Sequence, residues 1–332
     1  MQSLRLCGLL GVLLALTPDL ATAAEPPSPA QAAPPAQTET SAEVLKRANE
    51  LLVTNKFSEA EEEFHRAETL AGGQCGECAL GVATVRASEG KWEESADLIQ
   101  RALPQLTSPA VLSRAYNQLG MAYVKKGGAE NLAKAEEAMR SAADYGGAWG
   151  NIAHVNLAQV LFLERRWADA VPAAREALAK TAADPEMSKA ARIILCQARS
   201  YLPDELPASA EGGTDAMKAG GEVSHPEKLA GVPPAYTEEA RAAKIRGVVI
   251  VESIIDAEGC VRKARVIQGL PNGLSAAALE AMRLWVFSPA RFQDKPVPVF
   301  YNLSVNFQIS VNPNPPNPAS VTPAPVKPPA HR

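Results

Sequence analysis

The feature that most constrains the fold is a set of small and apolar residues that recurs at helical spacing. Its four occurrences are Ala60–Phe64–Ala67, Ser95–Ile99–Ala102, Ala135–Met139–Ala142 and Ala170–Ala174–Ala177. Successive sets begin 35, 40 and 35 residues apart. Residues spaced by three and four positions share one helix face. A period of this length is typical of stacked helix pairs, each of which cannot bury its own apolar face alone. The sequence therefore predicts a series of helix pairs over residues 42–202.

One of the helices expected before these sets resembles a tetratricopeptide signature. The residues at the signature spacing are Tyr116, Leu119, Gly120 and Tyr123, and a weaker version is His154, Leu157, Ala158 and Leu161. Three sets are preceded, three positions earlier, by an aromatic residue: Phe57, Trp92 and Trp167. The resemblance implies an N-terminal all-α solenoid of four pairs, with a longer turn near Gly127–Gly128 and a capping helix at 186–202. It also implies a protein-binding concave surface.

A different period begins in the last third of the chain. Two paired strands are predicted over residues 247–256 and 260–267. The turn that joins them contains Gly259, which supplies a permissive backbone. Residues 300–309 alternate again as a last strand. Helices are expected at 238–244 and at 274–285, the second with Trp285 on the face turned to the sheet. This order predicts a small α+β module over 226–310 with an antiparallel three-stranded sheet. The whole chain is therefore expected to be of mixed α and α/β class, with an all-α region before this module.

The motifs of this module resemble, in order and spacing, those of the C-terminal domain of the TonB energy-transducer family. The matching residues are Tyr236, Ala240, Arg241, Gly247, Val249, Val251, Ile255, Asp256, Gly259, Val261, Ala276, Ala277, Ala278, Leu279, Trp285, Phe287, Pro289, Ala290, Lys295, Pro296 and Val297. Three positions depart from the pattern. Ser253 stands where a large apolar residue is usual, Thr237 where proline is usual, and Arg241 where some members carry glutamine.

The resemblance implies binding and not catalysis. Members of that family capture an extended peptide, the TonB box of an outer-membrane transporter, by adding it as a strand to a sheet edge. An edge strand offers unpaired N–H and C=O groups to such a peptide. We expect the edge to be strand 300–307, and we expect Trp285, Phe287 and Pro289 to hold it as core and turn residues. The predicted partner-binding residues are Arg241, Tyr301, Leu303, Val305 and Phe307.

Residues 1–24 are interpreted as a secretory signal. The apolar run Leu6–Leu16 is shorter than the roughly 20 residues that span a bilayer, and Ala21–Ala23 offers small residues for cleavage. This predicts a periplasmic protein, whereas an uncleaved segment would anchor it in the inner membrane. Residues 25–41 are expected to be a Pro-rich linker, 203–225 a flexible linker and 311–332 a Pro-rich disordered tail.

Four cysteines follow the expected signal: Cys75, Cys78, Cys196 and Cys260. An oxidising compartment favours disulfides. The CxxC pair Cys75 and Cys78 is interpreted as a local disulfide or two packed thiols. The redox state and the pairing of all four cysteines stay open at this stage.

The formal net charge of −4 gives no basic field for a nucleic-acid backbone. The sequence carries no recognisable phosphate loop, metal-ligand cluster or catalytic carboxylate pair, so no cofactor, nucleic acid or small-molecule substrate is expected. Three functions compete. The first is a periplasmic adaptor whose last strand binds a transporter peptide and whose repeats bind another periplasmic protein. The second is a membrane-anchored energy transducer, and the third is an enzyme. The short apolar run favours the adaptor, and the enzyme has the least support.

Overall fold

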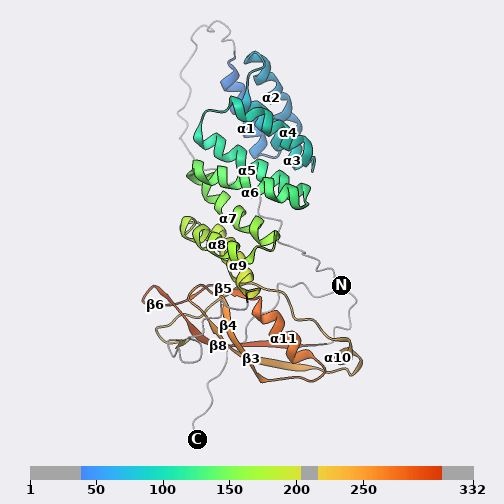
Figure 1. Ribbon diagram of the computed structural model, residues 1–332, viewed down its shortest axis with the longest axis vertical. Coiled ribbons are helices and arrows are strands. Elements are labelled where there is room, and N and C mark those ends of the chain that lie inside the picture. The colour runs from blue at the N-terminus through green and yellow to red at the C-terminus, as the bar shows by residue number, and fades with distance from the viewer. Residues whose placement is uncertain (1–38, 203–215, 309–332) are drawn as a thin grey trace, which may run out of the picture. The chain divides into compact units, whose positions relative to one another are not determined.

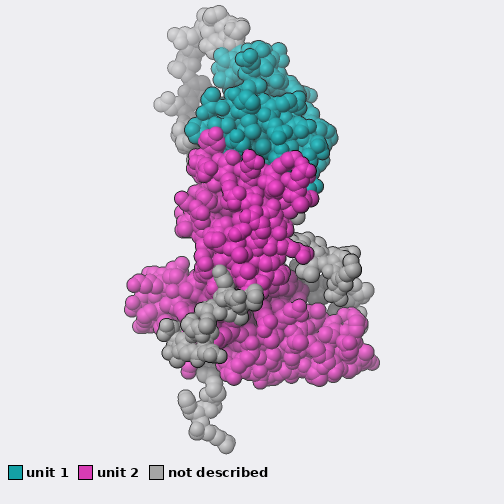
Figure 2. Space-filling view, viewed as in Figure 1, with its two compact units in different colours: residues 1–127 teal, residues 128–332 magenta. Residues whose placement is uncertain are grey.

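The computed structural model describes residues 39–202 and 216–308 (Figure 1). The expected signal segment, most of both linkers and the C-terminal tail lie outside the described residues. The chain divides into two compact units, residues 1–127 and 128–332 (Figure 2). The division falls at Gly127–Gly128, within the helical region, and not where the helices give way to the sheet. Within the described ranges, no helix is both long and apolar enough to cross a membrane.

The first unit is helical. Its elements are α1 (Ser41–Val53), α2 (Phe57–Leu70), α3 (Gly76–Ser88), α4 (Trp92–Ala102), a 3-10 turn (Leu103–Gln105) and α5 (Pro109–Lys126). α1 packs against α2, α3 against α4, and α4 against α5. A capping box starts the series, because Thr40 accepts from the backbone N–H of Glu43 at 3.3 Å and donates its own N–H to the Glu43 carboxylate at 2.8 Å.

The recurring small residues of this unit allow two helix backbones to approach closely. All six predicted positions are buried: Ala60, Phe64, Ala67, Ser95, Ile99 and Ala102. The Ser95 hydroxyl donates to the Ala83 carbonyl at 2.8 Å, so its polar group is satisfied in the core. Gly81 meets the ring of Phe64 so closely that an added Cβ would lie 2.2 Å from it.

The second unit begins with the remaining helices, which are α6 (Ala129–Tyr145), α7 (Gly147–Leu163), α8 (Trp167–Lys180) and α9 (Pro185–Ser200). Each packs against the next. The six predicted positions here are also buried: Ala135, Met139, Ala142, Ala170, Ala174 and Ala177. The Trp167 ring lies 4.8 Å from that of Phe162 and stacks on Tyr201 at 4.5 Å. The expected helical series is therefore confirmed, with α9 as its last helix.

A four-stranded sheet follows in the same unit (Figure 1). Its strands are β1 (Met217–Lys218), β3 (Gly247–Ile255), β4 (Val261–Gln268) and β8 (Val299–Phe307), in the order β1-β8-β3-β4. β3 is antiparallel to both neighbours, and β1 is parallel to β8. The prediction of three strands is thus wrong by one. β1 lies in the stretch assigned to the flexible linker, and two residues are too few to show strand alternation in a sequence.

Two small sheets and two helices complete this C-terminal module. The strands are β2 (Lys228–Ala230), paired with β5 (Val286–Phe287), and β6 (Ala290–Phe292), paired with β7 (Lys295–Val297). The helices are α10 (Glu238–Ala242) and α11 (Leu274–Arg283). One face of the large sheet forms the core with α11; its buried members include Val249, Val251, Ile255, Leu274, Ala278, Met282, Leu303, Val305 and Phe307.

Trp285 lies in this core, as the sequence predicted, but α11 ends two residues before it at Arg283. The indole N–H donates to the Val232 carbonyl at 2.8 Å. Gly231 has a φ of 154°, and an added Cβ there would lie 2.2 Å from the indole ring. Only glycine therefore allows the chain to pass this close to Trp285.

Candidate functional site

β8 has one fully paired side and one partly open side. Its residues pair with β3 from Val299, opposite Ile255, to Phe307, opposite Gly247. On the other side, β1 pairs only with Val299 and Phe300. In the described part of the chain, no strand pairs with Tyr301–Phe307 on that second side. The module therefore has an incomplete sheet edge there.

A single hydrogen bond indicates which backbone groups of β8 point to the open side. The N–H of Met217 donates to the Pro298 carbonyl at 2.9 Å, which in a parallel pair places the N–H and C=O of Phe300 on the β1 side. The direction alternates along a strand. The outward N–H groups on the open stretch are therefore those of Asn302, Ser304 and Asn306.

The open stretch of β8 and the edge strand β4 differ in the side chains that border them. On β8, Asn302 and Asn306 are exposed, Ser304 is half-buried, and none of them is charged. The opposite edge strand, β4, carries three cationic side chains: Arg262, Lys263 and Arg265. Charged side chains, lysine above all, protect an edge from strand addition. The open stretch of β8, Tyr301–Phe307, carries no charged side chain of this kind.

The predicted binding residues on β8 lie on its core side. Leu303, Val305 and Phe307 are buried. Tyr301 is half-buried, and its burial raises the pKa of the phenol above its ordinary value. The backbone N–H groups of these four residues face β3, so an added peptide would have to pair with the residues between them. Partner binding by the four side chains stays a prediction.

Arg241 lies on α10 and is exposed. Its guanidinium is 3.7 Å from the Glu238 carboxylate and 5.8 Å from the centre of the Tyr236 ring. Tyr236 in turn contacts the ring of Phe307 edge-on, with ring centres 5.8 Å apart, and its hydroxyl donates to the Ile245 carbonyl. The structure thus brings Arg241 close to the Phe307 end of β8.

Two of the departures from the family pattern have structural roles that the sequence did not reveal. Ser253 is buried, and its hydroxyl donates to the Tyr301 carbonyl at 2.8 Å, which ties β3 to β8 beside the open stretch. Thr237 caps α10, because its hydroxyl oxygen accepts from the Ala240 N–H at 3.3 Å. Its hydroxyl also donates to the Asn272 carbonyl at 2.5 Å.

The four cysteines form two disulfides. Cys75 and Cys78 are bonded at the start of α3, so of the two alternatives for the CxxC pair the structure has the local disulfide and not two packed thiols. Cys196 of α9 and Cys260 of the β3–β4 turn are also bonded, across a separation of 64 residues. That second pairing was not predicted. No group of His, Cys, Asp and Glu residues that could hold a metal ion occurs among the residues described.

Comparison with known proteins places the module in a family. Residues 232–309 match the family model of the Gram-negative bacterial TonB protein C-terminal. Comparison with curated proteins gave no match. The C-terminal module is therefore TonB-like, and the family it matches is associated with the Gram-negative envelope.

Solved structures of repeat proteins resemble about half of the chain. One is the APC/C hetero-tetramer Cut9–Hcn1, with 22% identity, a TM-score of 0.41, and coverage of 49% of this chain and 30% of that one. Another is YrrB, a TPR protein with an unusual peptide-binding site, with 19% identity, a TM-score of 0.39, and coverage of 50% and 79%. A third is the C-terminal part of a TPR repeat-containing protein from Cytophaga hutchinsonii, with 13% identity, a TM-score of 0.41, and coverage of 53% and 67%. The chain joins a series of packed helices, α1–α9, to a C-terminal module that matches the TonB C-terminal family model.

Proposed function

We propose that this chain is a periplasmic adaptor and not an enzyme. Its TonB-like module captures an extended peptide of an outer-membrane transporter by strand addition, and its helical repeats bind a second periplasmic protein. It needs no cofactor for either task. The observation that carries the proposal is the open side of β8 from Tyr301 to Phe307.

The energetic argument rests on backbone groups. An extended peptide beside β8 would accept hydrogen bonds from the N–H groups of Asn302, Ser304 and Asn306 and donate to their carbonyls. Such bonds are independent of the peptide's side chains, so they supply affinity without selectivity. Selectivity would come from the side chains nearby, among them exposed Phe300 on one face of the sheet and Tyr301 on the other.

A proline scan of the edge tests this proposal. Ser304→Pro removes one outward N–H, whereas Ser304→Ala keeps it and serves as the matched control. We expect Ser304→Pro to weaken binding of a synthetic peptide from the periplasmic N-terminus of a transporter by roughly tenfold, since a hydrogen bond contributes about 1 kcal/mol and proline also obstructs the incoming strand. The measurement is calorimetric titration, with amide exchange of β3 to verify the fold. Unchanged binding by a folded Ser304→Pro protein would exclude β8 as the docking edge.

The adaptor proposal also requires export and release from the inner membrane. We expect the mature protein to begin near Ala24 or Glu25 and to be recovered from the periplasm. Mass spectrometry of the intact protein from periplasmic and membrane fractions measures both. An intact Met1 terminus in the inner-membrane fraction would replace this proposal with that of an anchored energy transducer.

A further inference from the structure

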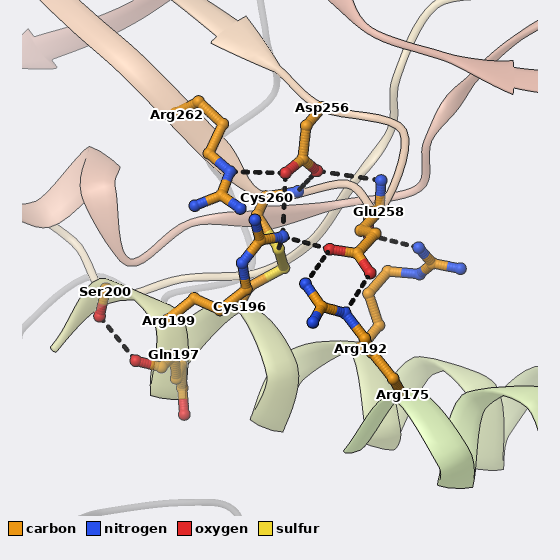
Figure 3. Close-up of a disulfide and its surroundings, with 10 residues drawn as sticks. All are labelled: Arg175, Arg192, Cys196, Gln197, Arg199, Ser200, Asp256, Glu258, Cys260 and Arg262. Carbon is orange, nitrogen blue, oxygen red and sulfur yellow. Dashed lines mark hydrogen bonds and ion pairs between the residues drawn. A yellow bond between two sulfur atoms is a disulfide. The ribbon is translucent and has the colours of Figure 1, made fainter. Parts of the chain in front are cut away.

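The turn between β3 and β4 is a rigid loop that presents two carboxylates (Figure 3). One oxygen of Asp256 accepts from the backbone N–H groups of Glu258 and Cys260, both at 2.9 Å. Gly259 has a φ of 86°, and an added Cβ there would lie 2.0 Å from the Phe287 carbonyl oxygen. The turn is thus fixed in shape by its own hydrogen bonds and by close contact with β5.

Arginines of α8 and α9 contact this turn (Figure 3). Arg175 donates to the Glu258 carboxylate at 2.9 Å, and Arg192 donates to the Glu258 backbone carbonyl. Arg199 is paired with Asp256 at 3.1 Å and also with Glu258. The last two helices of the repeats therefore hold the turn chiefly through charged groups.

The disulfide between Cys196 and Cys260 crosses the same contact. Both cysteines are buried, with 6% and 3% of their surface exposed. They belong to an apolar cluster that includes buried residues of α7, α8 and α9, but the buried residues of the C-terminal module in that cluster are only Cys260 and Val286. The apolar part of this contact is therefore small on the module's side, and the disulfide is its one covalent link within the described residues.

We propose that the Cys196–Cys260 disulfide is a redox-controlled latch that holds the C-terminal module against α9. The closed latch fixes the sheet to the last helix of the repeats. Reduction leaves the ion pairs, the polar contacts and the small apolar contact as the remaining links, so the module then separates from α9 while its own fold persists. This inference does not depend on peptide capture by β8. The peptide-binding test of Ser304→Pro and the tests of the disulfide below therefore have independent outcomes.

The chemistry of the latch requires a dithiol as the reductant. One thiolate of the dithiol attacks a sulfur of the Cys196–Cys260 bond and forms a mixed disulfide, and its second thiolate then displaces the remaining cysteine. The protein gains two electrons and two protons as two thiols, and the dithiol becomes a disulfide. Because both sulfurs are buried, the attack requires local opening of the contact, so the closed latch resists reduction.

Non-reducing peptide mapping and amide exchange of the full-length chain test the proposal. Mapping should recover a linked peptide pair that contains Cys196 and Cys260. In the double variant C196S/C260S, we expect amides of the last turns of α9 and of the β3–β4 turn to exchange roughly tenfold faster or more. The chain offers a matched control in C75S/C78S, which removes the other disulfide and should leave those amides unchanged. Amides of the β3–β8 ladder should stay protected in both variants.

Reversibility is the second measurement, and it needs no substitution. Dithiothreitol should accelerate exchange at the same amides of the wild-type protein, and reoxidation with oxidised glutathione should restore their protection. Two results would overturn the latch. Exchange of α9 and of the turn within about twofold of wild type in C196S/C260S would show that the polar contacts alone hold the module. Equal acceleration across β3 and β8 would show that the disulfide stabilises the module's own fold instead of its attachment.

Discussion

The helical repeats and the C-terminal module fill their cores in opposite ways. The repeats bring helices together with small residues such as Ala60, Gly81 and Ala170, so there is little space between the backbones. The core of the module instead includes a large side chain, Trp285, which has a glycine against its ring and a carbonyl on its indole N–H. This difference indicates that the repeats are most sensitive to added atoms and the module to removed atoms.

The largest expected effect is that of Trp285→Ala. Removing a buried tryptophan costs roughly 3–5 kcal/mol, because the cavity closes only in part. Amide exchange at β3 should accelerate accordingly. Trp92→Ala is the matched control in the repeats, where the side chain is only half-buried at the first position of α4. If Trp92→Ala lowered the free energy of unfolding more than Trp285→Ala, the module would not be the region more sensitive to removed atoms.

Adding a single methyl group tests the other half of the comparison. Gly81→Ala places a Cβ 2.2 Å from the Phe64 ring, and overpacking of this kind costs about 1–3 kcal/mol. The first unit should therefore unfold at a lower denaturant concentration. A second substitution, Phe64→Leu, should recover part of the loss in the double variant, since the two residues are in contact. If the stability losses of the two single variants simply added in the double variant, the contact between Gly81 and Phe64 would not be the cause of the destabilisation.

A smaller effect is expected at the polar position in the module's core. Ser253→Ala removes the hydroxyl that donates to the Tyr301 carbonyl and should cost about 1 kcal/mol. Ser304→Ala changes a half-buried serine on the neighbouring strand and should have almost no effect. Amide exchange at β3 compares the stability of the two variants. Equal stability of both variants would mean that the buried hydroxyl contributes nothing to the β3–β8 pairing.

The last expected effect depends on pH. Lys228 lies with its ammonium 3.3 Å from the centre of the Trp285 ring, and burial lowers its pKa to about 8. Between about pH 8 and its ordinary value of about 10.5, the folded state has lost a proton that the unfolded state still binds. Stability attributable to Lys228 should therefore rise with pH in that window. The difference in melting temperature between wild type and Lys228→Met, followed from pH 7 to 10.5, should change with the same sign; a constant difference would contradict the assignment.

Local periodicity explains how much of the fold could be predicted. The positions of the recurring sets, such as Ala135 and Ala174, are buried because a helix face repeats every three to four residues. The alternation along residues 300–309 likewise predicted the strand that the structure shows as β8. β1 could not be predicted, because its two residues gain their structure from pairing with Val299 and Phe300 and carry no pattern of their own.

The candidate site was predicted less completely, for a related reason. The sequence predicted strand 300–307 as the docking edge, but it could not show that β1 covers the start of its outer side or that the outward N–H groups belong to Asn302, Ser304 and Asn306. Those facts depend on hydrogen bonds between distant segments. The Cys196–Cys260 disulfide could not be predicted either, since a separation of 64 residues leaves no local signal in the sequence. Cys75 and Cys78, in contrast, are three residues apart.

The short strand β1 has a consequence for any segment that pairs with β8. It covers two of the nine residues of β8 and leaves Tyr301–Phe307, a stretch of roughly 24 Å at about 3.4 Å per residue. A segment that enters from the Phe307 end would run against β1 once it reached Tyr301. β1 would therefore limit the length of the added strand and set where that strand stops, independently of the side chains that the strand carries.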